Sequence, residues 1–462
     1  MSADSANPPA VKDPSLSGLV GVYGFAIFLV AGPWIIMVAA IAILSALACP
    51  TNACGEIDLF RSILIYNFLL SLLLIGPISL PITRFVSDEI YAGRHRAIVS
   101  AFVAGLAVLA VAGVIVVGPF LIFGAQLGAP TKLAAFENCM LMGAAWLIGP
   151  LLGALGDFRV VSLSFLAGAC IMVGIAIVSP VKDALALLNA FSGGLAVANA
   201  GMLWGLMKLE PVDFRIDWRV FGSIRRYWML GLIGLLYYLG IWIDNVVMWL
   251  ASPSGVSRVG GVFQTMPDYD AVMFWAQLTT IPVLAYFAVN VEPRLSQLNR
   301  QFHAALGRHA SRREIEIDRA ALANFVWRSV LGIFVAAMVL MCAVMLASFW
   351  GIDRLGLRAN QMGMFRAGLF GVAFHTAAMF GLMFMMFFDL RRSALAVSLV
   401  YFVLNGALTV AFMPLGFAYF GYGSMLAGAL AFAVTLFLLA RELPWLSYHA
   451  FVTNNVSLRG AS

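Results

Sequence analysis

The chain is dominated by long apolar runs that contain almost no charged residues. Twelve runs, each about long enough to cross a bilayer, follow one another between residues 19 and 440. Only 11% of the 462 residues are charged and 62% are hydrophobic, whereas a soluble domain has roughly 25% charged residues. The runs are continuous rather than alternating, which argues against a β-barrel. The sequence therefore predicts an all-α polytopic membrane protein without a large soluble domain or a nucleic-acid partner.

The distribution of Lys and Arg predicts the topology of these spans. The predicted spans are residues 19–48, 62–82, 97–124, 139–156, 160–180, 184–207, 228–250, 271–291, 325–350, 364–388, 393–415 and 421–440. With this arrangement, 20 of the 28 basic residues lie on one side and 6 on the other, with 2 inside spans. Basic residues concentrate in cytoplasmic loops. We therefore expect both termini of this multi-pass protein to be cytoplasmic.

The span count divides the chain into two halves. We expect a cytoplasmic tail at 1–18, a six-helix bundle at 19–207, a basic cytoplasmic linker at 208–227, a second six-helix bundle at 228–440 and a cytoplasmic tail at 441–462. Residues 292–324 form a long cytoplasmic loop in which Leu295, Leu298, Phe302 and Leu306 recur at helical spacing. This loop is predicted to be either an amphipathic helix on the membrane or a partner, or a solvated extension of the eighth span.

Ionisable residues inside membrane spans are costly and usually face a cavity or a partner. Asp244 lies in the run YYLGIWIDN of the seventh span. It is either a cavity carboxylate that binds a cation, a proton or a sugar amine, or a buried group held by a neighbour. Tyr237, Tyr238 and Trp242 lie beside it, and they suit sugar stacking as well as ordinary packing.

Three further polar residues are candidates for the same site. His375 lies near the middle of the tenth span and either relays protons or hydrogen-bonds between helices. Arg366 on the same span either snorkels to the headgroups or lines an exit path for an anionic glycan or a lipid phosphate. Asn67 in the second span either joins helices or faces a polar lumen.

No motif in the chain predicts an enzyme, a cofactor or a metal site. A Walker A loop, an HExxH motif, a CxxC pair and a GxSxG elbow do not occur. Cys49 and Cys54 lie in the first external loop, where a disulfide is one expectation in an oxidising compartment. We therefore expect transport or a structural role rather than catalysis.

Several runs together resemble the Pel exopolysaccharide exporter family (PelG), within the multidrug and oligosaccharide-lipid flippase superfamily. These runs are AGPWII (31–36), LPITRFVSDEIYAGR (80–94), LLYYLGIWIDNVVMWL (235–250), YDAVMFWAQLTTIPVLAYFAVNVEP (269–293), FFDLRRSAL (387–395) and FGYG (420–423). Their order and spacing match over nearly the whole chain. Asn245 departs from the pattern, because a basic residue would be expected after Asp244. This departure would leave Asp244 freer to bind a cation.

The resemblance implies two six-helix bundles around a central cavity that opens alternately to each face. The substrate would be an amino-sugar-rich biofilm polysaccharide crossing the bacterial inner membrane. Family members work beside a cytosolic glycosyltransferase and membrane partners that include a cyclic-di-GMP receptor. The predicted gate or partner surface consists of Arg84, Asp88, Asp389, Arg391 and Arg392, unless these are ordinary loop charges.

Other functions remain as alternatives. The nearest is a cation-coupled multidrug or lipid-linked oligosaccharide flippase of the same superfamily. A membrane-embedded polymerase or acyltransferase would require His375 and Asp244 to pair in mid-membrane. A scaffold without transport would have a closed, dry, apolar core.

Overall fold

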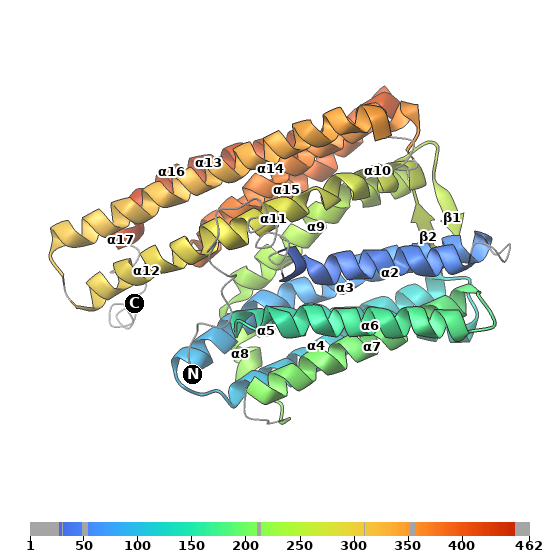
Figure 1. Ribbon diagram of the computed structural model, residues 1–462, viewed down its shortest axis with the longest axis horizontal. Coiled ribbons are helices and arrows are strands. Elements are labelled where there is room, and N and C mark those ends of the chain that lie inside the picture. Colours follow the sequence, from blue (N-terminus) through green and yellow to red (C-terminus); the bar gives the residue numbers. More distant parts are fainter. Residues whose placement is uncertain are drawn as a thin grey trace, which may run out of the picture. The chain divides into compact units, whose positions relative to one another are not determined.

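The computed structural model describes residues 27–48 apart from Val30, and residues 54–209, 214–308, 310–351 and 357–448. Contacts divide this part of the chain into two compact units (Figure 1). Unit 1 comprises described residues from Ile27 to Pro267, and unit 2 those from Asp268 onward.

Unit 1 is a helical bundle with one small hairpin. Its elements are α2 (Gly32–Ala48), α3 (Cys54–Tyr91), α4 (Ala97–Pro119), the π-helical turn η3 (Phe120–Gly124), α5 (Ala129–Ala154), α6 (Phe158–Val178), α7 (Ala184–Leu209), α8 (Arg219–Arg226), α9 (Trp228–Ala251), β1 (Ser257–Val259) and β2 (Phe263–Thr265). The two strands are antiparallel, with Val259 opposite Phe263. Gly260 and Gly261 have positive φ angles of 57° and 85°, which permits the tight turn between the strands.

Unit 2 is helical throughout its described residues. Its elements are α10 (Pro267–Leu278), α11 (Thr280–Tyr286), η4 (Phe287–Val291), α12 (Glu292–Gly307), α13 (Arg312–Gly351), η6 (Ala359–Gln361), α14 (Met362–Phe387), α15 (Arg391–Phe412), η7 (Met413–Leu415), η8 (Phe417–Tyr419), α16 (Tyr422–Glu442), η9 (Leu443–Trp445) and α17 (Leu446–Tyr448).

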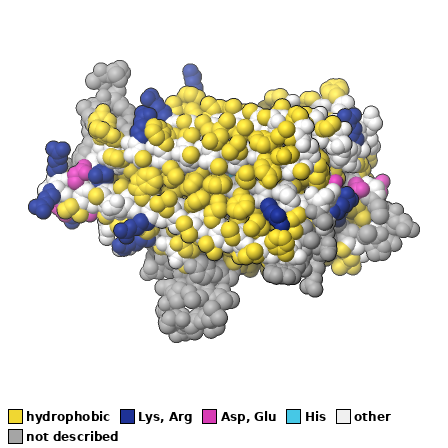
Figure 2. Space-filling view, turned by 90° about the horizontal axis from the view of Figure 1, so that it is seen from above, with side chains coloured by type: hydrophobic (Ala, Val, Ile, Leu, Met, Phe, Trp, Pro, Cys, Tyr) yellow, Lys and Arg dark blue, Asp and Glu magenta, His cyan; other side chains and the backbone are white. Residues whose placement is uncertain are grey.

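Within the described residues, the predicted membrane spans are confirmed as helices. Among the described residues, eleven helices are long and apolar enough to cross a membrane, and α2 is a shorter apolar helix within the predicted span 19–48. On the face shown in Figure 2, hydrophobic side chains cover most of the middle of the surface. Such an apolar surface is suited to lipid rather than to water. The chain is therefore a multi-pass helical membrane protein.

Small residues allow the helices within each unit to approach closely. In unit 1, an added Cβ at Gly168 of α6 would lie 2.4 Å from the carbonyl oxygen of Gly194 on α7. In unit 2, a Cβ at Gly423 of α16 would lie 2.6 Å from the backbone nitrogen of Thr409 on α15. Close backbone approach of this kind is typical of membrane helix packing, where dispersion replaces the hydrophobic effect.

The sequence analysis predicts that residues 228–440, which include α9, belong to the second bundle. By contacts, α9 groups with unit 1 because it lies against α3. A Cβ at Gly231 of α9 would lie 2.6 Å from the carbonyl oxygen of Pro77 on α3. The glycines of α9 and the Gly76–Pro77 step of α3 therefore hold the two helices in backbone contact.

The predicted loop 292–324 forms the two arms of a helical hairpin. The α12 helix continues directly from η4, and it packs against α13. Leu295 and Phe302 are buried, while Arg294 and Arg300 are exposed. This part of the chain is thus a helical extension of the eighth span whose apolar face is covered within unit 2.

Candidate transport site

Asp244 lies on the buried stripe of α9. Its side chain is only 2% exposed, and Gly240 and Met248, one turn away on either side, are also buried. The Asn245 side-chain amide donates a long hydrogen bond of 3.5 Å to Oδ1 of Asp244. The structure therefore places an acidic side chain inside an apolar helix, where ionisable groups usually face a cavity or a partner.

The aromatic residues predicted to accompany Asp244 are only partly buried. Tyr237, Tyr238 and Trp242 each keep an intermediate exposure. The Tyr237 and Tyr238 rings lie 5.8 Å apart with a tilt of 59°, and the Trp242 ring lies 6.2 Å from that of Trp249. The partly exposed rings of α9 therefore all precede Asp244 in the sequence, whereas Trp249, which follows it, is buried.

An aromatic cluster fixes the end of α9 that lies beyond Asp244, and the sequence analysis did not find it. Tyr66 of α3 stacks on Trp249 at 5.1 Å and on Phe120 at 5.7 Å. The Tyr66 hydroxyl also donates to the Gln264 carbonyl at 3.0 Å and accepts from the Gln264 amide at 3.1 Å. These bonds tie the hairpin to α3, and the stacking of Tyr66 on Trp249 joins α3 to α9.

Asn67 lies in a buried hydrogen-bond chain through unit 1. Its Nδ2 donates to the Ala135 carbonyl at 3.1 Å and to Asn138 Oδ1 at 3.0 Å, both on α5. Asn138 in turn donates to the Ser192 hydroxyl on α7 at 3.3 Å. Asn67, Asn138 and Ser192 are all less than 5% exposed. These contacts are those expected of a residue that joins helices.

The two candidates in unit 2 lie on α14. His375 is buried and stacks on Tyr401 of α15, with ring centroids 4.5 Å apart. The guanidinium carbon of Arg366 lies 4.8 Å from the ring centroid of Phe349 on α13, a cation–π geometry. His375 and Asp244 belong to different units.

At the predicted cytoplasmic end of unit 1, two of the predicted gate residues form one polar group. Arg84 and Asp88, one turn apart on α3, form an ion pair of 3.3 Å. The Tyr227 hydroxyl donates to Asp88 at 2.8 Å. Tyr227 immediately precedes α9. The group therefore connects α3 to the start of α9.

Glu89 is the buried member of this region, and the sequence analysis overlooked it. Its side chain is 6% exposed and accepts two bonds from Arg94, at 2.7 and 2.8 Å. Arg219 of α8, which also bonds Asp217, lies 3.2 Å away. The hydrogen bonds from Arg94, with the charge of Arg219, hold the pKa of Glu89 below its usual value against the opposing effect of burial. The sequence feature that could have identified Glu89 was its position within the run LPITRFVSDEIYAGR.

The other predicted gate residues lie at the turn between α14 and α15. Asp389 has a positive φ of 59°, and its two carboxylate oxygens accept bonds from Arg391 at 2.6 and 2.8 Å. Arg392 is exposed. The Asp389–Arg391 pair lies in unit 2 and the Arg84–Asp88 pair in unit 1.

The predicted disulfide lies outside the described part of the chain, because Cys49 and the Cys54 side chain are not described. Among the described residues, no group of three or more His, Cys, Asp or Glu side chains could hold a metal ion.

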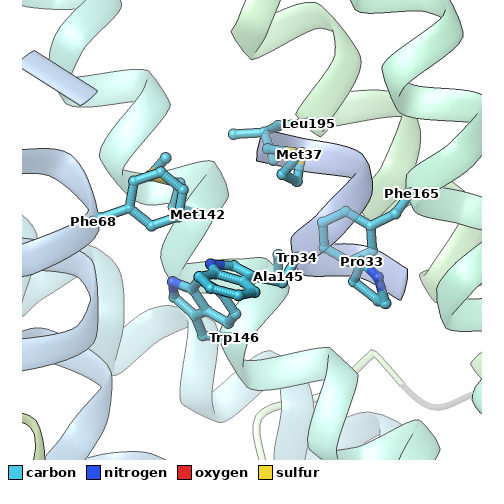
Figure 3. A pocket seen from close by; sticks show the side chains of 9 residues that line it. All are labelled: Pro33, Trp34, Met37, Phe68, Met142, Ala145, Trp146, Phe165 and Leu195. Carbon is cyan, nitrogen blue, oxygen red and sulfur yellow. The ribbon is translucent and has the colours of Figure 1, made fainter. Parts of the chain in front are cut away.

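An apolar pocket lies inside unit 1 (Figure 3). It is small, with a cavity volume of about 30 Å³, and is lined by Pro33, Trp34, Met37, Phe68, Met142, Ala145, Trp146, Phe165 and Leu195. The Trp146 indole nitrogen donates to the Ser71 hydroxyl at 3.3 Å, so its one polar atom is already bonded. The pocket thus offers aromatic and aliphatic surface, and part of it comes from the run AGPWII.

Comparison with known families decides the class of this membrane protein. The sequence profile described as "PelG: Putative exopolysaccharide Exporter (EPS-E)" matches residues 10–451. The chain belongs to the PelG family. The family and the fold are those of transporters rather than enzymes. A search of curated proteins gave no match.

Solved structures similar to this PelG-family chain are transporters of the MOP superfamily. A crystal structure of a MATE transporter in the straight conformation has a TM-score of 0.64 and 13% identity, covering 93% of this chain and 97% of that one. A MOP superfamily transporter from Pyrococcus furiosus, whose binding pocket is described as reversed in polarity, has a TM-score of 0.61 and 13% identity, covering 92% and 95%. At these identities the similarity establishes the fold.

Proposed function

We propose that this chain exports an amino-sugar-rich exopolysaccharide across the bacterial inner membrane. Membership of the exporter family supports a polysaccharide substrate. The choice of an amino sugar rests on the buried carboxylate of Asp244 and on the partly exposed aromatic rings along the same helix. A carboxylate attracts the ammonium group of an amino sugar, and aromatic faces pack against sugar rings.

The low dielectric around α9 strengthens this recognition. An ion pair that forms away from bulk water is attracted more strongly than one at the surface. In the proposed complex, the Asp244 carboxylate forms such a pair with the ammonium group of the glycan, and the Asn245 side-chain amide that bonds Asp244 Oδ1 lies beside it.

In the proposed mechanism, two six-helix bundles alternate in opening a central cavity to each face of the membrane. The Arg84–Asp88 and Asp389–Arg391 pairs, with Arg392, act as the cytoplasmic gate or as the surface for partners. Those partners are a cytosolic glycosyltransferase that supplies the polysaccharide and a membrane receptor for cyclic di-GMP. His375 and Arg366 would contact the glycan from α14.

A secretion experiment tests the role of Asp244. A strain carrying Asp244→Asn is compared with wild type and with Asn245→Ala at matched membrane levels of protein. Loss of an ion pair of about 1.4 kcal/mol corresponds to about tenfold in affinity, and we expect a comparable fall in secreted polysaccharide for Asp244→Asn. Unchanged secretion by this strain would remove Asp244 from the mechanism.

The apolar pocket of unit 1 favours a second candidate, a flippase for multidrug or lipid-linked oligosaccharide substrates. Its wall has no free polar group among the residues that line it, and an apolar cavity binds apolar molecules in preference to water. Replacement of Ala145 by Phe would fill the pocket. Reduced export of a lipid-linked or hydrophobic substrate with normal polysaccharide secretion would favour this second function.

A further inference from the structure

The segment 214–228 of unit 1 carries two different faces. Val220, Ser223 and Tyr227 are buried in the unit. On the exposed side, Trp218 is 75% exposed, and its ring centroid lies 5.4 Å from that of Phe221. Phe214, Ile216 and Trp228 are also exposed. A soluble surface would seldom present so many large apolar side chains together.

Basic side chains accompany this apolar surface. Arg225 and Arg226 form the last turn of α8 and are exposed. The Arg226 guanidinium lies 5.4 Å from the ring centroid of Tyr227. The combination of exposed aromatic residues with arginines is typical of helices that lie in the headgroup region of a bilayer.

The chain connections place this segment close to the membrane surface. The spanning helix α7 ends at Leu209, and the spanning helix α9 begins at Trp228. At the end of α7, the Lys208 ammonium lies 3.5 Å from the ring centroid of the exposed Trp204. Trp and Lys at helix ends mark the membrane–water interface. Because α8 ends at Arg226, only Tyr227 separates it from α9, and this short connection keeps α8 at the level of the headgroups.

Ion pairs fix the orientation of the segment before any lipid binds. Asp217 and Arg219, the neighbours of Trp218, bond each other at 2.7 Å, and Arg219 also reaches Glu89 of α3 at 3.2 Å. Burial disfavours the charge of Asp217, but the bonds from Arg219 outweigh it and lower the pKa of this carboxyl. The backbone that carries Trp218 is thus held on unit 1.

We propose that residues 214–228 form an interfacial site for anionic phospholipid, with Trp218 and Phe221 in the headgroup layer and Arg225 and Arg226 on the lipid phosphates. Two charge-assisted contacts to phosphate give selectivity for anionic over zwitterionic lipid. The site does not depend on the identity of the exported substrate.

The test uses the full chain in lipid nanodiscs and measures tryptophan quenching by brominated lipid. The difference in quenching between wild type and Trp218→Phe isolates the Trp218 contribution. We expect strong quenching of this contribution, with brominated phosphatidylglycerol more effective than brominated phosphatidylcholine. The double variant Arg225→Gln, Arg226→Gln should reduce this preference by about tenfold or more.

The matched control is Arg312→Gln, Arg313→Gln, which removes two exposed arginines from α13 and should leave the Trp218 preference unchanged. A Trp218 signal that brominated lipids do not quench would show that the segment lies away from the bilayer. Equal quenching by both lipids, or no effect of the Arg225 and Arg226 substitutions, would show that the site does not select anionic headgroups. Each of these three results overturns the proposal.

Discussion

Gly234 of α9 lies against Gly76 of α3 so closely that an added Cβ at Gly234 would stand 2.3 Å from the Gly76 carbonyl oxygen. The obstacle is backbone, which cannot rotate aside as a side chain can. The same two helices are joined near one end by Tyr227 and Asp88 and near the other by Trp249 and Tyr66. The α3–α9 pair is therefore fastened at three levels.

The first prediction concerns this crossing. Gly234→Ala should destabilise the protein by about 2 kcal/mol, because overpacking of a well-packed site costs about 1–3 kcal/mol. The control is Gly174→Ala on α6, where nothing lies within 4 Å of the added Cβ. There the higher helix propensity of alanine should leave stability unchanged or raise it by up to about 1 kcal/mol. Thermal unfolding in detergent measures the stability of both variants. Equal effects of the two substitutions would contradict the close contact between Gly234 and Gly76.

The second prediction separates two roles for Asn67. Asn67→Ala removes the donor to Ala135 and Asn138 and should destabilise the protein by about 1–3 kcal/mol. The control is Asn290→Ala, which removes an exposed hydrogen bond from the Asn290 side chain to the Tyr286 carbonyl four residues earlier. This substitution should have little effect on stability. A variant at Asn67 that keeps its unfolding temperature but loses transport would instead show that Asn67 contacts the substrate.

The third prediction is a pH dependence at Glu89. The α3 helix has 38 residues, about 57 Å at 1.5 Å per residue, and a hydrocarbon core is roughly 30 Å thick. Glu89 is two residues from the end of this helix and outside the predicted span 62–82, so it can titrate with the solvent.

Because the pKa of Glu89 is lowered in the folded state, its stabilisation is complete above the ordinary value of 4.5 and is lost as the pH falls through the lowered value. Glu89→Gln should therefore be less stable than wild type at pH 7, by about 1 kcal/mol, and the difference should shrink below about pH 4.5. Arg94→Gln provides the matched variant, since it removes the main partner. A difference that stays constant with pH would contradict the ion-pair role.

Much of the fold could be predicted because membrane spans leave a strong local pattern. The short separators between the fourth, fifth and sixth spans are one example. Asp157 caps α6 by accepting a bond from the Val160 amide at 3.2 Å, and the two charged residues at 182–183 lie just before α7. Such breaks depend only on neighbouring residues, so the sequence reveals them.

The contacts between distant residues could not be predicted in this way. Glu89 was hidden among the four charged residues of 84–94, and only folding brings Arg219 to it. The Tyr66 cluster joins α3, η3, α9 and β2, elements far apart in the sequence. Likewise, the backbone contact of Gly234 with Gly76 depends on the crossing of two helices, which no periodicity encodes.

The central claim, that this chain moves an amino-sugar glycan with the help of Asp244, is tested most directly by transport into proteoliposomes. Purified wild-type protein and Asp244→Asn are reconstituted, and the uptake of partly de-N-acetylated oligosaccharide is compared with that of the fully N-acetylated form. We predict uptake of the amino form by wild type and about a tenfold loss with Asp244→Asn. Uptake equal to that of protein-free liposomes would contradict export of this glycan, and equal uptake by both proteins would contradict the role of Asp244.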